Sequence, residues 1–340
     1  MKNKKSKKYH FILFLFITSL IIGLLKINLN FDKKVYYFSL FDEFISRNIN
    51  SQADTIELKV KKDFFHDGNG ELFGVQGIDG FSTNNQFELY IANGYKNSLA
   101  LINKKKSIYR KIKNNTNHKN PTELLADVFY KNDNEIFWTS YRNNVIYKSN
   151  NNLKINKKEF AKGFNHPIGI SGNDEIIIVA DQYNGDIVCL NKEGDEIWRK
   201  KYFLNYKLQK NPYGVSVFKN FAYITFSRGW IYNNIIKIDL NGNVKEVIFK
   251  SLINGKIFSN IQAIDHDSNG NIYFHDTDNN RILFYSNKMK LLNVLKINSM
   301  KRGRGLAILK PDNFILVSGF KRGREYKTEL SGFWLIDQIQ

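Results

Sequence analysis

Two short basic segments near the C-terminus contain the residues best suited to bind an anion. Lys301-Arg302-Gly303-Arg304 and Lys321-Arg322-Gly323-Arg324 repeat one four-residue pattern. Arginine binds carboxylate and phosphate groups through two parallel hydrogen bonds, and glycine lets the backbone approach a ligand closely. We therefore predict an anion-binding surface, with a solvated basic rim as the alternative. Its residues are Arg302, Arg304, Arg322 and Arg324, joined by Arg142 and Arg228, which follow apolar segments in a similar way.

Histidines and aspartates at the ends of two apolar segments are candidates for acid–base chemistry in a central channel. These are His166, His275, Asp181 and Asp276. An asparagine follows each aspartate three residues later, so bracing of a turn is the stronger expectation for both carboxylates. No Ser/His/Asp set, glycine-rich phosphate loop or Cys/His cluster can be identified. The sequence therefore predicts no catalytic residue and leans away from an enzyme.

An internal repeat supplies the elements that would position these side chains. Similar segments recur around Gly77, Glu123, Gly169, Gly214, Ala263 and Gly305, and Pro121, Pro167 and Pro212 share one repeat position. A spacing of about 46 residues is typical of propellers. Each repeat contains short β-branched and aromatic runs bounded by Asn, Asp and Gly, such as Glu175–Ala180 and Phe221–Phe226, which indicate strands. Four strands in each of six repeats predict an all-β, six-bladed β-propeller of four-stranded blades.

Closure of the ring needs one strand from outside the repeats. The last repeat ends after its third strand, at the C-terminus, and an open sheet edge is a site for unwanted pairing. Residues 55–62 (TIELKVKK) precede the first repeat and have the composition of a strand. We expect this segment to form the outer strand of the last blade, so that the propeller domain covers residues 55–340.

Two of the repeats resemble NHL repeats. The matching residues are Pro167, Gly169, Ile170, Ala180, Asp181 and Asn184 in one repeat, and Ile264, Asp265, Asp276, Asn279, Arg281 and Ile282 in another. The resemblance covers about residues 70–340 and implies a propeller of the SMP-30/NHL/strictosidine-synthase-like superfamily. Calcium-dependent lactonases of that group carry an asparagine where Ile168 and Tyr213 stand here, and an aspartate where Gln262 stands. A lactonase is therefore disfavoured; no cofactor is predicted, while a divalent cation in the channel stays an open alternative.

The N-terminus has the pattern of a membrane signal. Residues 1–8 carry five lysines, and the run from Phe11 to Leu25 contains no charge. No small-residue cleavage site follows, and the first alanine is Ala53. We expect a cytoplasmic tail at 1–8, a transmembrane signal anchor at 9–29 and a linker at 30–54, with the propeller outside the cytoplasm, in the periplasm or extracellular space. Secretion after signal cleavage is the alternative.

The excess of positive charge indicates the kind of partner. The formal net charge is +19, from 51 basic and 32 acidic residues. Because nucleic acid is a poor partner outside the cytoplasm, an anionic ligand, an envelope polysaccharide or an acidic protein is the better candidate. We therefore expect a membrane-anchored binding or assembly module. A propeller hydrolase or lyase acting in the central channel is the alternative.

Overall fold

The computed structural model describes residues 50–336, with gaps at 67–74, 84–85, 95–97, 104–105, 114–122, 133–134, 151–156, 205–206, 209, 229–231, 249–251, 258, 299, 301, 312 and 323–328. Within these ranges no helix has the length and apolar content needed to cross a bilayer. The expected tail, anchor and most of the linker, residues 1–49, lie outside the described residues.

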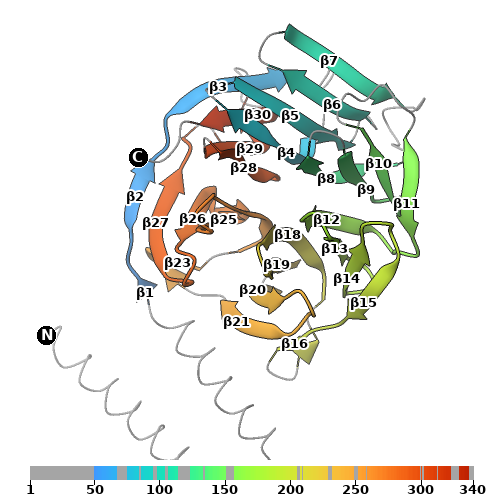
Figure 1. The fold of residues 1–340 in the computed structure, drawn as a ribbon. Coiled ribbons are helices and arrows are strands. Elements are labelled where there is room, and N and C mark those ends of the chain that lie inside the picture. Colours follow the sequence, from blue (N-terminus) through green and yellow to red (C-terminus); the bar gives the residue numbers. More distant parts are fainter. Residues whose placement is uncertain are drawn as a thin grey trace, which may run out of the picture.

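Antiparallel sheets are arranged as a ring around a central axis, which is a β-propeller (Figure 1). Three sheets have four strands each. They are formed by β8 (Leu125–Asn132), β9 (Glu135–Ser140), β10 (Val145–Ser149) and β11 (Lys158–Lys162); by β12 (Pro167–Gly172), β13 (Ile176–Asp181), β14 (Asp186–Asn191) and β15 (Glu196–Lys200); and by β18 (Pro212–Phe218), β19 (Phe221–Arg228), β20 (Tyr232–Asp239) and β21 (Val244–Ile248).

The other two large sheets include strands from both ends of the described chain. A five-stranded sheet has β24 (Ile261–His266), β25 (Ile272–Asp276), β26 (Arg281–Tyr285), β27 (Leu291–Lys296) and β2 (Asp54–Glu57). An eight-stranded sheet has β3 (Val60–His66), β30 (Glu329–Ile336), β29 (Phe314–Arg322), β28 (Leu306–Pro311), β4 (Val75–Thr83), β5 (Gln86–Asn93), β6 (Ser98–Asn103) and β7 (Lys106–Lys113). The short strands β1 (Asn50–Ser51), β22 (Leu252–Ile253) and β23 (Lys256–Ile257) form a small sheet of their own, and β16 (Phe203–Leu204) pairs with β17 (Lys207–Leu208). The 3-10 turn η2 (Thr277–Asn279) lies between β25 and β26.

The prediction of a six-bladed propeller is wrong in its number of blades, because the described residues form five large sheets in the ring. Strands β28 and β4 pair in parallel at two positions, Lys310 with Phe81 and Pro311 with Ser82. This pairing joins the four strands of the last repeat to the four strands of the first. Six innermost strands, β4, β8, β12, β18, β24 and β28, nevertheless surround the axis and contact one another in that order.

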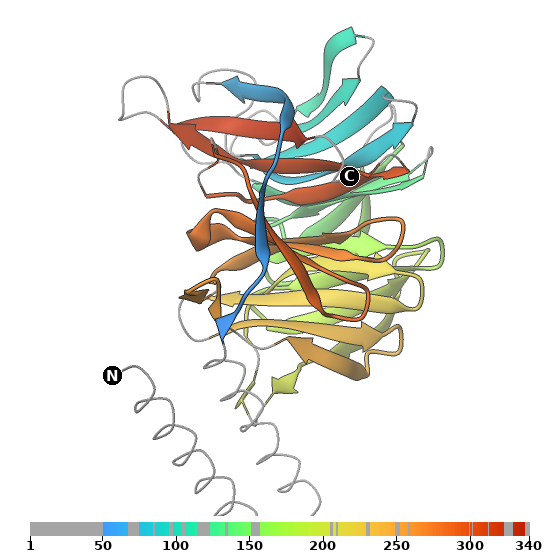
Figure 2. The ribbon, with the colours of Figure 1, turned by 90° about the vertical axis from the view of Figure 1, so that its left-hand side faces the viewer.

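The expected closing strand is divided between two sheets. Asp54–Glu57 pairs in parallel with β27 as a fifth strand, and Val60–His66 pairs antiparallel with β30. Figure 2 shows this segment crossing the outside of the ring from one sheet to the other. Between the two strands, the Leu58 backbone N–H donates to the Lys296 carbonyl, and its side chain is buried. The segment therefore ties two neighbouring sheets together.

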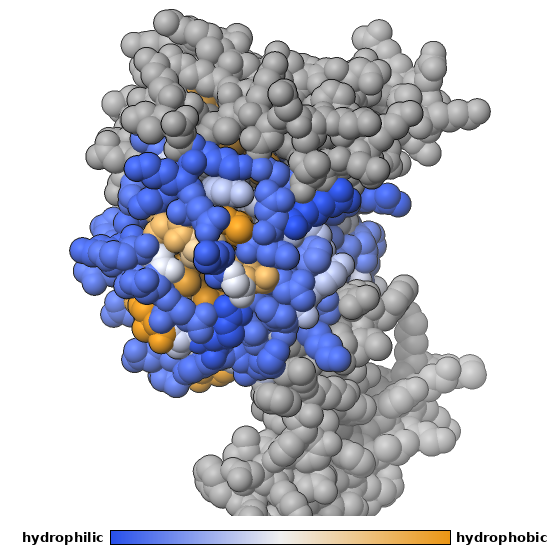
Figure 3. Space-filling view, turned by 90° about the vertical axis from the view of Figure 1, so that its right-hand side faces the viewer, coloured by the Kyte–Doolittle hydropathy of each residue, from blue (hydrophilic) through white to orange (hydrophobic). Residues whose placement is uncertain are grey.

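Apolar residues on both faces of the strands form the core. In β13 and β14 nearly every side chain is buried, whereas the outer strand β15 is mostly exposed or half-buried. Each sheet packs on both neighbours, so its inner strands need apolar residues at consecutive positions rather than alternate ones. One such cluster joins Ile178 and Cys189 to Val215 and Ile224 of the next sheet. The coloured part of the side of the ring shown in Figure 3 is largely hydrophilic, with an apolar patch.

The second repeat was aligned four residues too early. A register shift follows the first residue of the innermost strand, at Pro167 in β12 and at Leu125 in β8. The residue of β8 that corresponds to Gly169 is therefore Asp127 rather than Glu123. Glu123 lies before the strand and forms an ion pair with Lys157, and Pro121 lies outside the described residues.

Candidate functional site

A cavity of about 390 Å³ lies at the centre of the ring. All six innermost strands contribute to its walls, so residues at equivalent positions of the repeat form layers around the axis. We name the face at which the chain enters these strands the mouth face. The turns between second and third strands lie on the same face, because successive strands of a sheet are antiparallel.

One layer consists almost entirely of small residues. Its members are Gly77, Asp127, Gly169, Gly214, Ala263 and Gly305. A Cβ atom on Gly214 would lie 2.9 Å from the Gln262 carbonyl oxygen, so the neighbouring backbone leaves little room for a side chain. Asp127 is the exception, and its carboxylate occupies the space beside Gly77. The absence of a side chain at Gly77 thus accommodates a carboxylate in the channel wall.

Three channel carboxylates bind the backbone of adjacent innermost strands. The Tyr130 N–H donates to Asp79 at 2.7 Å, the Ile170 N–H to Asp127 at 3.1 Å, and the Ile308 N–H to Asp265 at 2.7 Å. Apart from the short pairing of β28 with β4, the described innermost strands have one edge without a sheet partner, and buried N–H groups need acceptors. These aspartates therefore supply acceptors that hold neighbouring strands together around the axis.

The three carboxyl groups have different acidities. Burial, reinforced by the negative charge of Asp265, raises the pKa of Asp79 to about 7. Burial also raises the pKa of Asp127 well above its usual range. For Asp265 the effect of burial is outweighed by Lys310 and His266, which lower its pKa. The channel therefore holds one firmly ionised carboxylate and a carboxyl group that titrates near neutral pH.

Asp79 should make the protein less stable as the pH rises from 5 to 8. Its pKa is higher in the folded state than the ordinary value of 3.8, so the stabilisation is complete below pH 3.8 and is lost progressively as the pH rises to about 7. The expected loss from this group is on the order of 2 kcal/mol. The difference between denaturant unfolding free energies at pH 5 and pH 8 should shrink by that amount in Asp79→Asn. It should not change in Asp174→Asn, where the side chain is exposed.

A second polar cluster lies away from the mouth face, where Asp265, His266 and Lys310 line the cavity. Ser216 Oγ lies 2.7 Å from His266 Nδ1 and 3.1 Å from Asp265, and Lys310 Nζ lies 3.0 Å from His266 Nε2. In a catalytic triad the serine and the carboxylate bind opposite imidazole nitrogens. Here both lie on the Nδ1 side, and Ser216 is buried. The cluster is therefore a packed hydrogen-bond network and not a nucleophile with its base.

Arg304 is the basic residue in the layer of described residues nearest the mouth of the cavity. The layer nearest the mouth face contains Gln76, Ala126, Ile168, Tyr213, Gln262 and Arg304. Arg304 is half-buried, and neighbouring Arg302 is exposed. Among the described residues, neither guanidinium group has an ion-pair partner. The arrangement leaves two cationic groups of the predicted surface available at the mouth.

For the other predicted arginines the structure describes less. Arg142 is exposed in the turn between β9 and β10, on the mouth face. Arg228 and Arg322 are the last residues of β19 and β29, at the same face, but their side chains fall outside the described part. Arg324 lies outside the described residues altogether.

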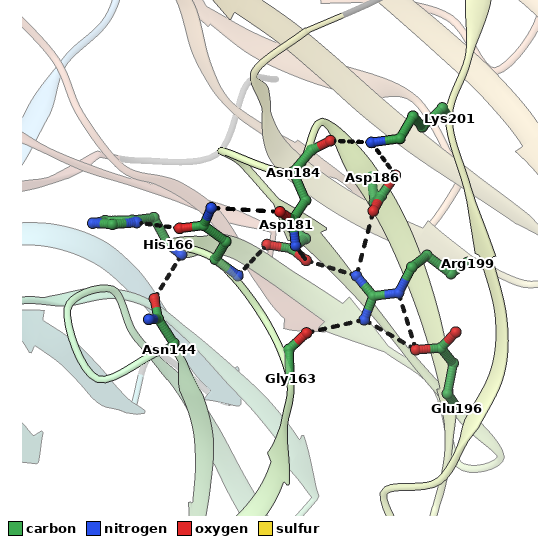
Figure 4. A network of polar contacts seen from close by, with 10 residues as sticks. Asn144, Gly163, His166, Asp181, Asn184, Asp186, Glu196, Arg199 and Lys201 are labelled. Carbon is green, nitrogen blue, oxygen red and sulfur yellow. Dashed lines mark hydrogen bonds and ion pairs between the residues drawn. The ribbon is translucent and has the colours of Figure 1, made fainter.

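The structure places His166, Asp181, His275 and Asp276 outside the residues that line the central cavity. Asp181 is fully buried at the end of β13 and accepts hydrogen bonds from the Asn165 N–H, Asn184 and Arg199 (Figure 4). Asp276 accepts in the same way from the Ser259 N–H, Asn279 and Arg281. Both aspartates brace the turn that follows a second strand.

His275 is a buried histidine without a hydrogen-bond partner at either ring nitrogen among the described residues. Burial lowers its pKa to about 3, so it is neutral. Three other sheets have hydroxyl groups at the corresponding position: Thr139 accepts from the Asp127 N–H at 2.9 Å, Thr225 from the Gly214 N–H at 2.8 Å, and Ser318 from the Gly305 N–H at 2.7 Å. In place of such a bond, the His275 ring packs against Gly303.

Sequence analysis missed the three channel aspartates as site residues. Asp79 and Asp265 stand two residues after Gly77 and Ala263, at one position of the repeat, so a slightly longer alignment would have revealed them. Asp127 was hidden because the second repeat was aligned on Glu123. Within the described ranges, no three His, Cys, Asp or Glu side chains are arranged to hold a metal ion.

Comparison with solved structures identifies the fold. Virginiamycin B lyase from Staphylococcus aureus is 17% identical over 82% of this chain and 89% of its own, with a TM-score of 0.52. Regucalcin, a calcium-binding protein from Agrobacterium tumefaciens, is 8% identical over 84% of this chain and 97% of its own, with a TM-score of 0.55. The chain has the β-propeller fold of these proteins. The propeller expected from the NHL-like repeats is thereby confirmed as a fold.

No protein-family model and no curated protein sequence matches the chain. A propeller in the nidogen–laminin complex also shares the fold, with 12% identity over 68% of this chain and 84% of its own and a TM-score of 0.51. Sequence identities this low support a shared fold alone, because propellers of the same architecture carry unrelated sites.

Proposed function

We propose that this propeller is a binding module that takes an anionic group at the mouth of its central channel. The observation that carries the proposal is Arg304, a half-buried arginine in the cavity wall with no ion-pair partner in the described part of the chain. Exposed Arg302 adjoins it, and Arg142 lies on the same face. A cation at the rim of a concave site binds anions more strongly than one on an open surface, because less solvent screens it.

The ligand class follows from the same groups. A guanidinium group favours carboxylate, sulfate or phosphate through paired hydrogen bonds. Gln76 and Gln262 of the same layer can add hydrogen bonds to hydroxyl or amide groups. Acidic envelope polysaccharides and acidic proteins both present such anions, and they are the partners we propose.

Chromatography on immobilised polygalacturonate tests the proposal. Arg302→Gln/Arg304→Gln should elute at clearly lower salt than the wild type, with an affinity for soluble oligogalacturonate reduced about tenfold or more. The matched control is Lys192→Gln/Lys288→Gln, which removes the same charge from exposed turns on the opposite face. Equal shifts for both variants would mean that bulk positive charge alone causes retention, and the proposal would be wrong.

A second candidate function is hydrolysis or elimination inside the channel. Asp79 favours it, because a cavity carboxyl group with a pKa of about 7 is suited to act as a general acid or base at neutral pH. Virginiamycin B lyase, which shares the fold, is named as a lyase. Turnover of virginiamycin B that is lost in Asp79→Asn would support this alternative over the binding module.

We also propose that the module is anchored in a membrane with the propeller outside the cytoplasm. The support is the sequence of residues 1–29, with five lysines before an uncharged apolar run. Recovery of intact N-terminal peptides from membrane fractions is expected. A mature chain beginning near residue 27 would instead establish a cleaved signal.

A further inference from the structure

A second cavity, of about 580 Å³, opens on the mouth face between the sheets of β12–β15 and β18–β21. Its volume falls within the range of roughly 300–1,000 Å³ that is usual for small-molecule sites. Its walls are formed by Asn165, Gln182, Tyr183, Asn184, Lys210 and Asn211. Four of these six side chains are carboxamides and one is aromatic, a composition unlike that of the central cavity.

Tyr183 presents an aromatic face to this cavity. Its side chain is 60% exposed, the largest exposure among the large apolar residues of the described chain. One face of the ring stacks on His166, with centroids 4.2 Å apart and an interplanar angle of 26°. Tyr141 packs edge-on against His166 at 4.5 Å and donates to Gln182 Oε1 at 3.2 Å. His166 therefore covers one face of the Tyr183 ring, while much of Tyr183 stays exposed.

The surrounding loops are fixed by partly buried hydrogen bonds. Asn165 donates through its N–H to Asp181 at 2.7 Å, and Asn184 donates to the same carboxylate at 2.9 Å (Figure 4). The His166 N–H donates to Asn144 at 2.8 Å, which secures the residue beneath Tyr183. A site held in this way loses little conformational freedom when a ligand binds.

We propose that this second cavity binds a saccharide unit. A pyranose ring has an apolar face of C–H groups, which suits the negative face of an aromatic ring, and a rim of hydroxyl groups that both donate and accept. Carboxamides also both donate and accept, so the half-buried Gln182, which accepts from Tyr141 through Oε1, can donate to such a rim through its amide nitrogen. Lys210, which is exposed at the edge, adds a cation that favours a uronic acid over a neutral sugar. This site is separate from the anion site at Arg304.

Ligand-observed saturation-transfer NMR with a fixed panel tests the proposal. The panel is methyl glucoside, N-acetylglucosamine, galacturonic acid and their disaccharides, with adenosine as the competing aromatic ligand. At least one sugar should show transfer to its ring C–H protons, with a Kd of about 1 mM, as expected for a single exposed stacking site. Absence of transfer to every sugar, or transfer to adenosine alone, would overturn the proposal.

Variants of Tyr183 separate stacking from nonspecific contact. Tyr183→Ala should weaken binding at least tenfold, whereas Tyr183→Phe, which keeps the ring, should bind within about threefold of the wild type. Ile197→Ala removes an exposed apolar side chain from β15 and serves as the control without effect. Unchanged binding in Tyr183→Ala would overturn the proposal. Because Arg302 and Arg304 are untouched, retention on polygalacturonate through the channel mouth is measured separately.

Discussion

Deletion of residues 55–62 is expected to prevent stable folding of the propeller. The deletion removes most of β2 from its parallel pairing with β27 and the start of β3 from its pairing with β30. It also removes buried Leu58 and the Ile56 side chain that packs on the same core cluster. Two sheet edges would then be unpaired at once, a condition that promotes aggregation. The expected result is loss of the cooperative unfolding transition and recovery of the chain in aggregates.

The control for this deletion lies in the same segment. Asp54, Thr55 and Lys59 have exposed side chains, so their replacement by alanine should change the unfolding free energy by no more than about 0.5 kcal/mol. If the deletion variant unfolded with the same midpoint as the wild type, the segment would not close the ring.

Arg281→Met is expected to destabilise the protein by about 3–5 kcal/mol. Arg281 and Asp276 form an ion pair at 2.7 Å, with side-chain exposures of 2% and 0%. The same guanidinium group donates to the carbonyls of Ile253 and Lys256 at 2.8 and 2.9 Å. Its removal leaves a buried carboxylate and two carbonyl groups without this donor, and water cannot easily replace it. Denaturant unfolding measures the effect.

The matched comparison is Arg199→Met at the equivalent network of another sheet. Arg199 also binds a buried carboxylate, Asp181, at 2.7 Å, but its own side chain is 26% exposed. Solvent can therefore take over its hydrogen bonds, and a loss of about 1 kcal/mol is expected. Equal losses at the two positions would contradict the role assigned to burial of Arg281.

The strands and their repeat were predictable from sequence because short aromatic and β-branched runs alternate with Asn, Asp and Gly turns. The roles of Asp181 and Asp276 as turn braces were also the stronger expectation. The joining of first and last repeats was not predictable. It depends on the parallel pairing of Lys310 with Phe81 and of Pro311 with Ser82, and no sequence pattern marks this pairing.

The channel site was less accessible to sequence analysis than the fold. Asp127 stands where other repeats have glycine or alanine, and its role depends on the space that Gly77 leaves beside it. The raised pKa of Asp79 depends on burial and on a carboxylate that is distant in sequence, Asp265. Such interactions between residues that are distant in sequence form only when the ring closes. By contrast, Arg304 was identified from its basic tetrad, and the structure adds its position in the cavity wall.

The anion site at the channel mouth is tested most directly by an anomalous difference map from crystals soaked in tungstate. Tungstate is a dianion that arginine can bind through paired hydrogen bonds. The proposed function predicts an anomalous peak at the mouth of the central cavity, in hydrogen-bond contact with the Arg304 guanidinium group, and its loss in Arg304→Gln. Peaks confined to lysines of the opposite face, with none at Arg304 of the wild type, would contradict it.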